Sequence, residues 1–243
     1  MPGVLRIAHA YGSSRGALEL ALAAPVDIIE ADIWYRAGNI WVRHERRLGP
    51  LPMLADRGRP SGRFIIPLPN RYYLRPDINP MPLGELLEAV AGKKRLLLDV
   101  KARGGREVDA FARAIAQQVA AYQAGRWVSV CGQNWPVLHA LRERAPQLEV
   151  RYSIDRSYRW ERYLKLARSD EGARRICIQH RFLDGEKLAF LRRIGADIYC
   201  WTVNDRATAE ALISRGVRGI ISDDLALLAS LPSGETARPS AVE

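Results

Sequence analysis

Short apolar runs alternate with segments of helical composition along most of the 243 residues, and this alternation limits the possible folds more than any other feature. The apolar runs predict eight strands, at residues 4–9, from 26 onward, and at 95–101, 127–131, 149–153, 175–178, 197–203 and 217–222. Strand–helix units repeated over roughly 230 residues predict a TIM (β/α)8 barrel, an α/β fold whose usual length is about 250 residues. A doubly wound open sheet is the alternative. It is less favoured because no glycine-rich phosphate loop follows the first strand.

Two parts of the chain depart from this alternation. Residues 45–82 contain eight prolines and predict a long loop excursion rather than a separate domain, because the segment is too short and proline-rich for its own core. Such segments often form lids or binding loops, so we expect this one to lie over the rim of the barrel. Residues 233–243 are small and polar and predict a disordered tail, which leaves a single barrel domain over residues 1–232.

The composition excludes several classes of protein. Lys and Arg outnumber Asp and Glu by 37 to 27, which favours anionic small-molecule partners such as phosphate compounds. The basic residues are dispersed and no nucleic-acid-binding motif stands out, so no nucleic acid partner is expected. No apolar run approaches the roughly 20 residues of a membrane span. The first strand begins too early for a signal peptide, and the three cysteines lie in apolar runs. We therefore expect a cytoplasmic protein with reduced thiols. The sequence does not indicate its oligomeric state.

The most informative stretch is 26–44, in which carboxylates follow a buried strand. Glu30 and Asp32 are two residues apart, so on a strand both side chains project from one face. Asp99 and Lys101 repeat this spacing after another apolar run. Carboxylates side by side in a strand need a cation, and a hard divalent ion is the usual solution. Glu30, Asp32 and Asp99 therefore predict a site for one Mg²⁺ or Ca²⁺ ion. Zinc is disfavoured because no Cys/His cluster has ligand spacing.

Two of the four histidines belong to the same constellation. His9 ends the first strand, and His44 follows the turn at 37–39 and a second extended run. His180 also ends a strand, whereas His139 lies in a helical run and is expected to be structural or exposed. Because active sites of TIM barrels gather at the carboxyl ends of the strands, these strand ends predict one shared rim.

Together these residues predict a phosphodiester site. The cation and Lys101 would neutralise the phosphate oxygens as charge develops on them. Of His9 and His44, one would remove a proton from the nucleophile and the other would protonate the leaving alkoxide, with the assignment between them left open. Lys101 and Trp201, which lies near the end of the seventh strand, are assigned to substrate binding.

A series of motifs runs in order from about Arg6 to Leu228, and consists of His9, Glu30-x-Asp32, Gly38, His44, MPLGELLEAV, LLLDVK, WTVND and GVRGIISD. This series resembles the glycerophosphodiester phosphodiesterase family. Single motifs are weak, but their ordered combination is specific. The resemblance implies a TIM barrel with a metal at Glu30, Asp32 and Asp99 and acid–base roles for His9 and His44. It also implies cleavage of a glycerol phosphodiester to glycerol 3-phosphate and an alcohol.

The sequence departs from the family pattern at the first motif. The family usually opens with His-Arg-Gly, whereas this chain has His9-Ala10-Tyr11, so the arginine expected to contact phosphate is missing. Arg15, Arg43 or Arg46 could take its place. The third carboxylate is Asp99, where the family more often has glutamate. These changes leave the metal ligands and both histidines intact and bear mainly on the identity of the substrate.

Two other functions remain open on the sequence. A phospholipase D of the sphingomyelinase D type, acting on phospholipids or lysophospholipids, shares the barrel, the two histidines, the E-x-D pair and the D-x-K strand, and lacks the same arginine. Those enzymes are mostly secreted and contain disulfides, which disfavours this reading. A barrel that has lost activity and serves as a binding module is the second alternative, and the retention of all the candidate residues argues against it.

Overall fold

The computed structural model describes residues 3–43, 45–48, 51–54, 66–68, 72–74, 81–102 and 107–234, with the backbone alone described between 45 and 74. Within these residues, parallel strands form a closed barrel: β1 (Leu5–Ala8), β2 (Ile28–Arg36), β9 (Arg95–Val100), β10 (Val128–Gly132), β11 (Glu149–Ile154), β12 (Arg175–Gln179), β13 (Asp197–Trp201) and β14 (Gly219–Ser222). Strand β1 pairs with both β2 and β14, which closes the ring. The predicted eight-stranded TIM barrel is confirmed, and its strands start within about three residues of the predicted positions.

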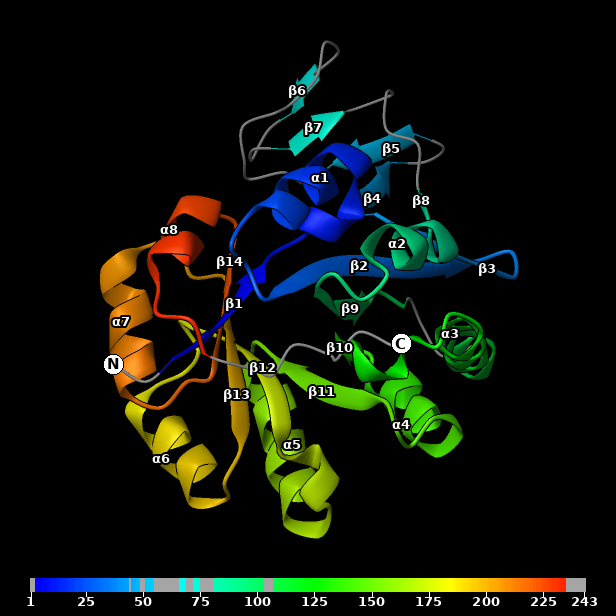
Figure 1. The fold of residues 1–243 in the computed structure, drawn as a ribbon. Coiled ribbons are helices and arrows are strands. Elements are labelled where there is room, and N and C mark those ends of the chain that lie inside the picture. Colours follow the sequence, from blue (N-terminus) through cyan, green and yellow to red (C-terminus); the bar gives the residue numbers. More distant parts are fainter. Residues whose placement is uncertain are drawn as a thin grey trace, which may run out of the picture.

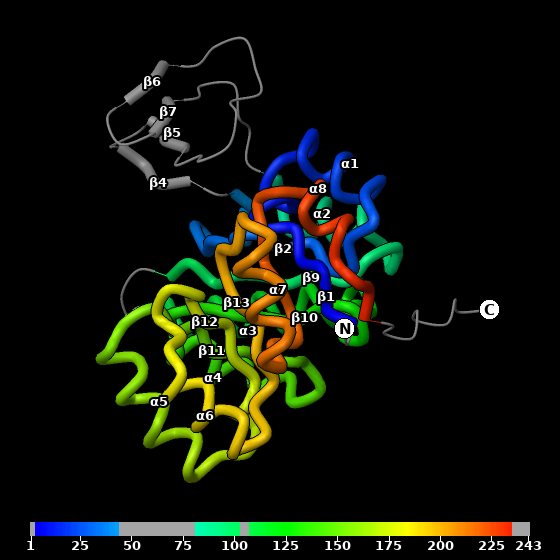
Figure 2. The backbone as a smooth tube through the Cα atoms, turned by 90° about the vertical axis from the view of Figure 1, so that its left-hand side faces the viewer, coloured from blue at the N-terminus to red at the C-terminus, as the bar shows by residue number. Residues whose placement is uncertain are grey.

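Helices follow the strands and lie outside the ring (Figure 1), and the view turned by 90° shows the same arrangement (Figure 2). They are α1 (Arg15–Ala23), α2 (Leu83–Val90), α3 (Val108–Ala121), α4 (Trp135–Arg144), α5 (Ser157–Ser169), α6 (Gly185–Arg193), α7 (Arg206–Ser214) and α8 (Leu225–Ser230), with short 3-10 turns at η1 (Tyr11–Ser13), η3 (Ala124–Arg126) and η4 (Glu171–Arg174). Several helices begin at a side-chain cap. For example, Asp184 and Asp205 accept hydrogen bonds from the first turns of α6 and α7.

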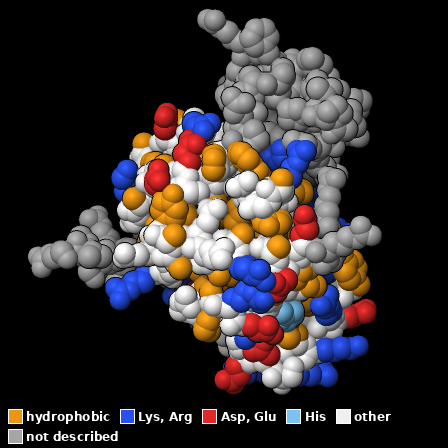
Figure 3. Space-filling model, turned by 90° about the vertical axis from the view of Figure 1, so that its right-hand side faces the viewer, with side chains coloured by type: hydrophobic (Ala, Val, Ile, Leu, Met, Phe, Trp, Pro, Cys, Tyr) orange, Lys and Arg blue, Asp and Glu red, His pale blue; other side chains and the backbone are white. Residues whose placement is uncertain are grey.

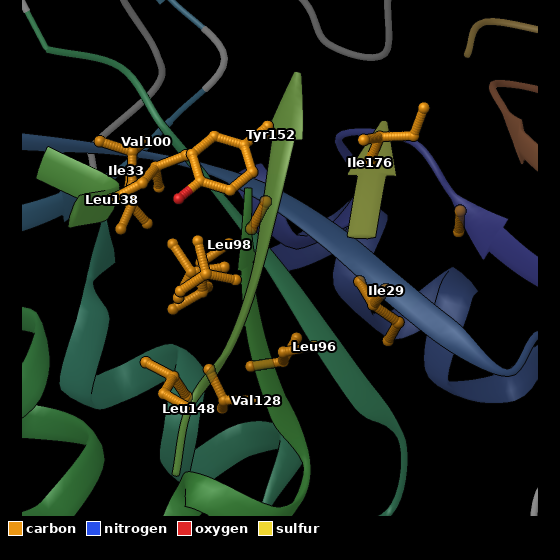
Figure 4. Close-up of a cluster of buried hydrophobic side chains, with 14 of the residues drawn as sticks. Ile29, Ile33, Leu96, Leu98, Val100, Val128, Leu138, Leu148, Tyr152 and Ile176 are labelled. Atoms are coloured by element: carbon orange, nitrogen blue, oxygen red, sulfur yellow. The ribbon is translucent and has the colours of Figure 1, made fainter. Parts of the chain in front are cut away.

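Alternate side chains of each strand enter two separate cores. One set, which includes Ile29, Leu96 and Leu98, packs against the helices in the larger core (Figure 4). The other set fills the inside of the barrel and consists of Leu5, Ile7, Ile28, Leu97, Cys131, Cys177, Tyr199 and Ile221. Successive residues of a strand point to opposite faces, so every second position near a strand end projects toward the barrel axis.

The end of the barrel at which the strands begin is closed by a buried polar cluster. The side chain of Arg151 is 1% exposed, and its Nη2 lies 2.6 Å from Asp197 Oδ2 and 2.7 Å from Glu149 Oε1. Its guanidinium stacks 3.4 Å from the centroid of the Tyr199 ring. Gly219 leaves the space that this ring fills, because a Cβ there would lie 2.5 Å from Tyr199 Cδ1. The interior is therefore filled below the carboxyl ends of the strands.

The predicted strand–turn–strand unit is also present. Strand β3 (Asn39–Val42) pairs antiparallel with β2, and the turn between them places Ala37 and Gly38 in the left-handed region, at φ 49° and 81°. Strand β8 (Met81–Pro82) then pairs with β3. This extension brings the chain back to the barrel just before α2.

The segment 45–82 is not uniformly irregular. Strands β4 (Glu45–Leu48), β5 (Leu51–Leu54), β6 (Ile66–Leu68) and β7 (Tyr72–Leu74) form an antiparallel sheet in the order β4-β5-β7-β6. At the other end, Ser233 forms a bridge with Val4, and Gly234 N donates to Val4 O at 2.9 Å. The ordered chain thus runs past residue 232, and the rest of the expected tail, 235–243, lies outside the described residues.

The surface is mixed in character. Asp109 forms ion pairs with Arg113 and Arg144. On the face shown in Figure 3, the described basic and acidic side chains are interspersed with apolar ones. This face offers no continuous basic surface for a nucleic acid backbone. In the described part of the chain, no helix combines the length and apolarity that crossing a bilayer requires.

We expect Gly219→Ala to lower the free energy of unfolding by about 1–3 kcal/mol, because the added methyl group would overpack the buried Tyr199 ring. Gly185→Ala is the matched control, since a Cβ there meets no atom within 4 Å. Urea denaturation of both variants and the unchanged protein measures the difference. Equal stability of the two variants would show that the ring has room to shift.

Candidate active site

The three predicted metal ligands lie together at the carboxyl ends of two neighbouring strands. Asp32 of β2 and Asp99 of β9 are direct partners in the parallel register, and Glu30 lies two residues earlier on β2. One carboxylate oxygen from each residue lies within 4.8 Å of the others. Glu30 and Asp32 are 3% and 1% exposed, so the cluster is buried at the point where the barrel interior opens to the rim.

Lys101 belongs to the same cluster. Its Nζ lies 2.9 Å from Asp32 Oδ1 and also pairs with Asp99 Oδ2. Burial alone lowers the pKa of this ammonium, but the charges of Asp32 and Asp99 outweigh it and hold the pKa well above its ordinary value. Lys101 therefore stays charged. When all three carboxylates are ionised, they leave an excess of two negative charges over the Lys101 ammonium, which one divalent cation would balance.

The state of Glu30 reflects this excess. Its burial, followed by the charge of Asp32, raises the pKa of the Glu30 carboxyl to about 8, and its Oε2 accepts a hydrogen bond of 2.6 Å from Ala10 N. Asp99 Oδ1 is buried and has no hydrogen-bond partner among the described residues. Mg²⁺ and Ca²⁺ prefer carboxylate oxygens as ligands. Because three carboxylates converge here and a buried oxygen of Asp99 lacks a hydrogen-bond partner, these residues fit a hard divalent cation.

The loop after β1 approaches β2 closely and helps to fix these carboxylates. Ser13 Oγ accepts a hydrogen bond of 3.2 Å from Asp32 N. A Cβ at Gly12 would lie only 2.6 Å from Ala31 Cβ, so the approach requires glycine. Ala10 adopts φ 60°, which turns its N–H toward Glu30. The motif that departs from the family pattern thus still supplies a hydrogen bond to a candidate metal ligand.

His9 directly follows β1 and faces the carboxylate cluster. Its Nδ1 lies 2.6 Å from Asp223 Oδ1, at the end of β14. Burial alone lowers the pKa of the imidazole, but the hydrogen bond to Asp223 and the charges of Glu30, Asp223 and Asp32 together raise it to about 9. The imidazole is thus held by Asp223 within the electrostatic influence of the candidate metal ligands Glu30 and Asp32.

His44 lies outside the described residues, but the backbone next to it is described. Arg43 N donates to Asp32 O at 2.9 Å, and Trp34 Nε1 donates to Arg43 O at 3.0 Å. Arg43 itself is 7% exposed and lies over the Trp34 ring, 5.9 Å from its centroid. The chain is therefore anchored beside the carboxylate pair one residue before His44.

The other candidates divide between the rim and the outer surface. Trp201 ends β13, and its carbonyl accepts a hydrogen bond of 2.8 Å from His180 N. His139 lies on α4, where its Nδ1 is 3.3 Å from the Tyr152 hydroxyl, and it takes no part in the rim. Arg15 forms a bidentate ion pair with Glu85, with Nε 2.5 Å from Oε1 and Nη2 2.6 Å from Oε2. The side chain of Arg46 is not described.

Sequence reasoning missed two residues of the rim, Asn204 and Asp223. Asp223 contacts His9, and Asn204 Nδ2 donates to Asp223 Oδ2 at 2.8 Å. Asn204 directly precedes Asp205, the N-cap of α7. Asn204 lies within the quoted segment WTVND and Asp223 ends GVRGIISD, and their positions shortly after β13 and β14 were the signal that could have identified them.

Comparison with known proteins agrees with this geometry. The model of the glycerophosphoryl diester phosphodiesterase family matches residues 14–227. No sequence among the curated proteins matches this chain.

Several solved structures share the fold. A Silicibacter pomeroyi protein provisionally named a glycerophosphoryl diester phosphodiesterase is 21% identical, with a TM-score of 0.74 over 94% of this chain and 92% of its own. A Thermotoga maritima glycerophosphodiester phosphodiesterase is 17% identical, with a TM-score of 0.67 over 93% and 97%. An Oleispira antarctica phosphodiesterase, solved with its product sn-glycerol-3-phosphate, is 17% identical, with a TM-score of 0.66 over 92% and 93%.

The family match spans most of the chain, and the barrel and the acidic cluster agree with it. The chain belongs to the glycerophosphoryl diester phosphodiesterase family, and thus to the phosphodiester hydrolases.

Proposed function

We propose that this protein cleaves glycerophosphodiesters to glycerol 3-phosphate and an alcohol, with one divalent cation held by Glu30, Asp32 and Asp99. The observation that supports this most directly is the buried carboxylate cluster beside Lys101 and His9, at the rim of a barrel of this family. The Oleispira antarctica protein binds its product sn-glycerol-3-phosphate, which supports our inference that the substrate of this chain contains a glycerol phosphate group.

The charges of the site suit a phosphodiester. A bound divalent cation supplies Lewis-acid stabilisation of charge on the phosphate oxygens. Lys101 adds a positive charge, because its two carboxylate partners keep the amino group protonated. The Ala10 N–H holds Glu30 in place, so the ligands are positioned before substrate arrives. Trp201, at the end of β13, offers an apolar surface to the substrate from the opposite part of the rim.

Proton transfer falls to His9 and His44. In-line displacement at phosphorus places the attacking and leaving oxygens on opposite sides, so two separate proton-transfer groups are needed. His9 faces the carboxylates from β1, and the anchored Arg43 leads into His44 from the arm that follows β2. His9 thus comes from the strand that precedes the Glu30–Asp32 strand and His44 from the arm that follows it, and we infer that their side chains face the bound phosphate from opposite sides.

We expect glycerophosphodiesters with varied alcohol groups to release glycerol 3-phosphate, and a chelator to abolish the reaction. Lysophospholipids form the second arm of the panel, because a sphingomyelinase D-like enzyme would release the head-group alcohol and leave the phosphate on the lipid. Product identification by mass spectrometry distinguishes the two reactions. Absence of turnover on both arms, with added cation, would instead support a binding module.

We expect Glu30→Gln to weaken Mg²⁺ or Ca²⁺ binding by at least about tenfold, because it removes one charged oxygen ligand. Calorimetric titration measures the affinity. At about 100 times the Kd, the cation should also stabilise the unchanged protein against urea by about 2.7 kcal/mol. Glu85→Gln is the control, since Glu85 pairs with Arg15 outside the cluster. Identical affinity in the two variants would refute the assignment of Glu30.

We expect His9→Ala and His44→Ala each to lower kcat by about 10²–10⁴-fold while cation affinity is largely kept. The double variant should lose less than the product of the two effects, because the pair acts as a unit. A substrate with a very good leaving group needs no proton on that group. It should therefore rescue the variant that lacks the acid and not the one that lacks the base. Near-normal rates of both variants on every substrate would contradict this mechanism.

A further inference from the structure

Asn204 and Asp223, which lie just after strands β13 and β14, form a hydrogen-bonded assembly with His9 and have no role in the reaction as proposed above. Asp223 Oδ1 lies 2.6 Å from His9 Nδ1, and Asp223 Oδ2 accepts a hydrogen bond of 2.8 Å from Asn204 Nδ2. The Tyr11 hydroxyl donates to Asp223 O at 3.0 Å, which fixes the backbone of the same residue. The side chains of His9 and Asp223 are 23% and 34% exposed, so the pair lies at the edge of the rim.

The orientation of the Asn204 amide follows from its other partners. Asn204 Oδ1 accepts hydrogen bonds from Ser222 Oγ at 2.9 Å and from Asp223 N at 3.0 Å. Since a backbone N–H can only donate, the oxygen of the amide must face it and the NH2 group must face the carboxylate. Asn204 therefore directs one oxygen of Asp223 toward itself and leaves the other for His9.

We propose that Asp223, oriented by Asn204, is a positioning residue that keeps a proton on Nδ1 of His9 and leaves Nε2 to exchange protons with the substrate. A carboxylate can only accept, so the nitrogen that faces it must carry hydrogen. The ring is thereby held in one tautomer and one orientation, and its positive charge is stabilised when Nε2 takes up a proton. The kinetic part of this proposal rests on the proposed function.

A strand-end ion pair that only stabilises the barrel is the competing explanation. It would make the pair a contributor to unfolding free energy, with no effect on which nitrogen carries the proton. The two explanations differ most clearly for Asp223→Asn. Asn204 would still donate to the new side chain and would attract its amide oxygen, so the amide NH2 would face His9. The neutral imidazole would then have to accept at Nδ1 and carry its proton on Nε2, which leaves Nε2 unable to accept a proton from the substrate.

The first experiment reads the tautomer without any substrate. Ring-15N-labelled histidine in the full chain gives long-range proton–nitrogen correlations, recorded at a pH at which His9 is neutral. The signals of His9 are identified by their loss in His9→Gln. We expect protonated Nδ1 in the unchanged protein and protonated Nε2 in Asp223→Asn. The same tautomer in both proteins would overturn the proposal.

The second experiment measures kinetics with a glycerophosphodiester and added Mg²⁺ or Ca²⁺. We expect Asp223→Asn to lower kcat by about 10²–10⁴-fold with little change in KM or cation affinity. Asn204→Ala should cause a smaller loss, about 10–100-fold, because Asp223 remains but is less firmly oriented. It also serves as the test if Asp223→Asn fails to fold. Unchanged kcat in both variants would overturn the proposal.

Asp224→Asn is the matched control. Asp224 is the next residue and caps α8 through Ala226 N and Leu227 N, and asparagine caps helices equally well. Its kcat and its His9 tautomer should equal those of the unchanged protein. If the unchanged protein cleaves no phosphodiester, the proposed function fails, and the nitrogen spectra still decide whether Asp223 sets the tautomer of His9.

Discussion

The structure of the rim depends on one electrostatic constraint, the burial of three carboxylates beside a single ammonium group. One carboxylate oxygen each of Glu30, Asp32 and Asp99 lies within 4.8 Å of the others, and Lys101 pairs with Asp32 and Asp99. Their mutual repulsion is tolerable because the Ala10 N–H holds Glu30 and the Lys101 ammonium offsets part of the negative charge, and a divalent cation would relieve the rest. The loop after β1, the glycine at position 12 and the Ala10 N–H all serve this arrangement.

The barrel and the clustering of the three carboxylates could be predicted from the sequence because both depend on short-range patterns. The spacing of Glu30 and Asp32 fixes their common face, and apolar runs of strand length fix where β9 ends and thus where Asp99 lies. The Asn204–Asp223 assembly depends instead on the closure of the ring, which brings the end of β14 to the end of β1. No local pattern reports a contact of that range, so the strand-end positions of these two residues indicate the rim but not their hydrogen bonds with each other and with His9.

The departures at the first motif have a partial physical account. Ala10 lies where the family usually has arginine, and it contributes its N–H rather than a cationic side chain. Arg15 is engaged by Glu85, and Arg43 lies over Trp34, so both are held by partners within the chain. The four short strands within 45–82 were not predicted because prolines at positions 52 and 67 argue against strands, yet both positions pair with neighbouring strands.

The hydrogen bond between His9 and Asp223 joins residues 214 positions apart, one at the end of the first strand of the barrel and the other at the end of the last. The imidazole can reach its partner only after β14 has closed the ring against β1. During synthesis the ribosome releases the C-terminal strand last, so a nascent chain contains its three acidic residues long before it contains the partner that orients His9. In the mechanism proposed above, the orientation of His9 is therefore gained only when the last strand closes the ring.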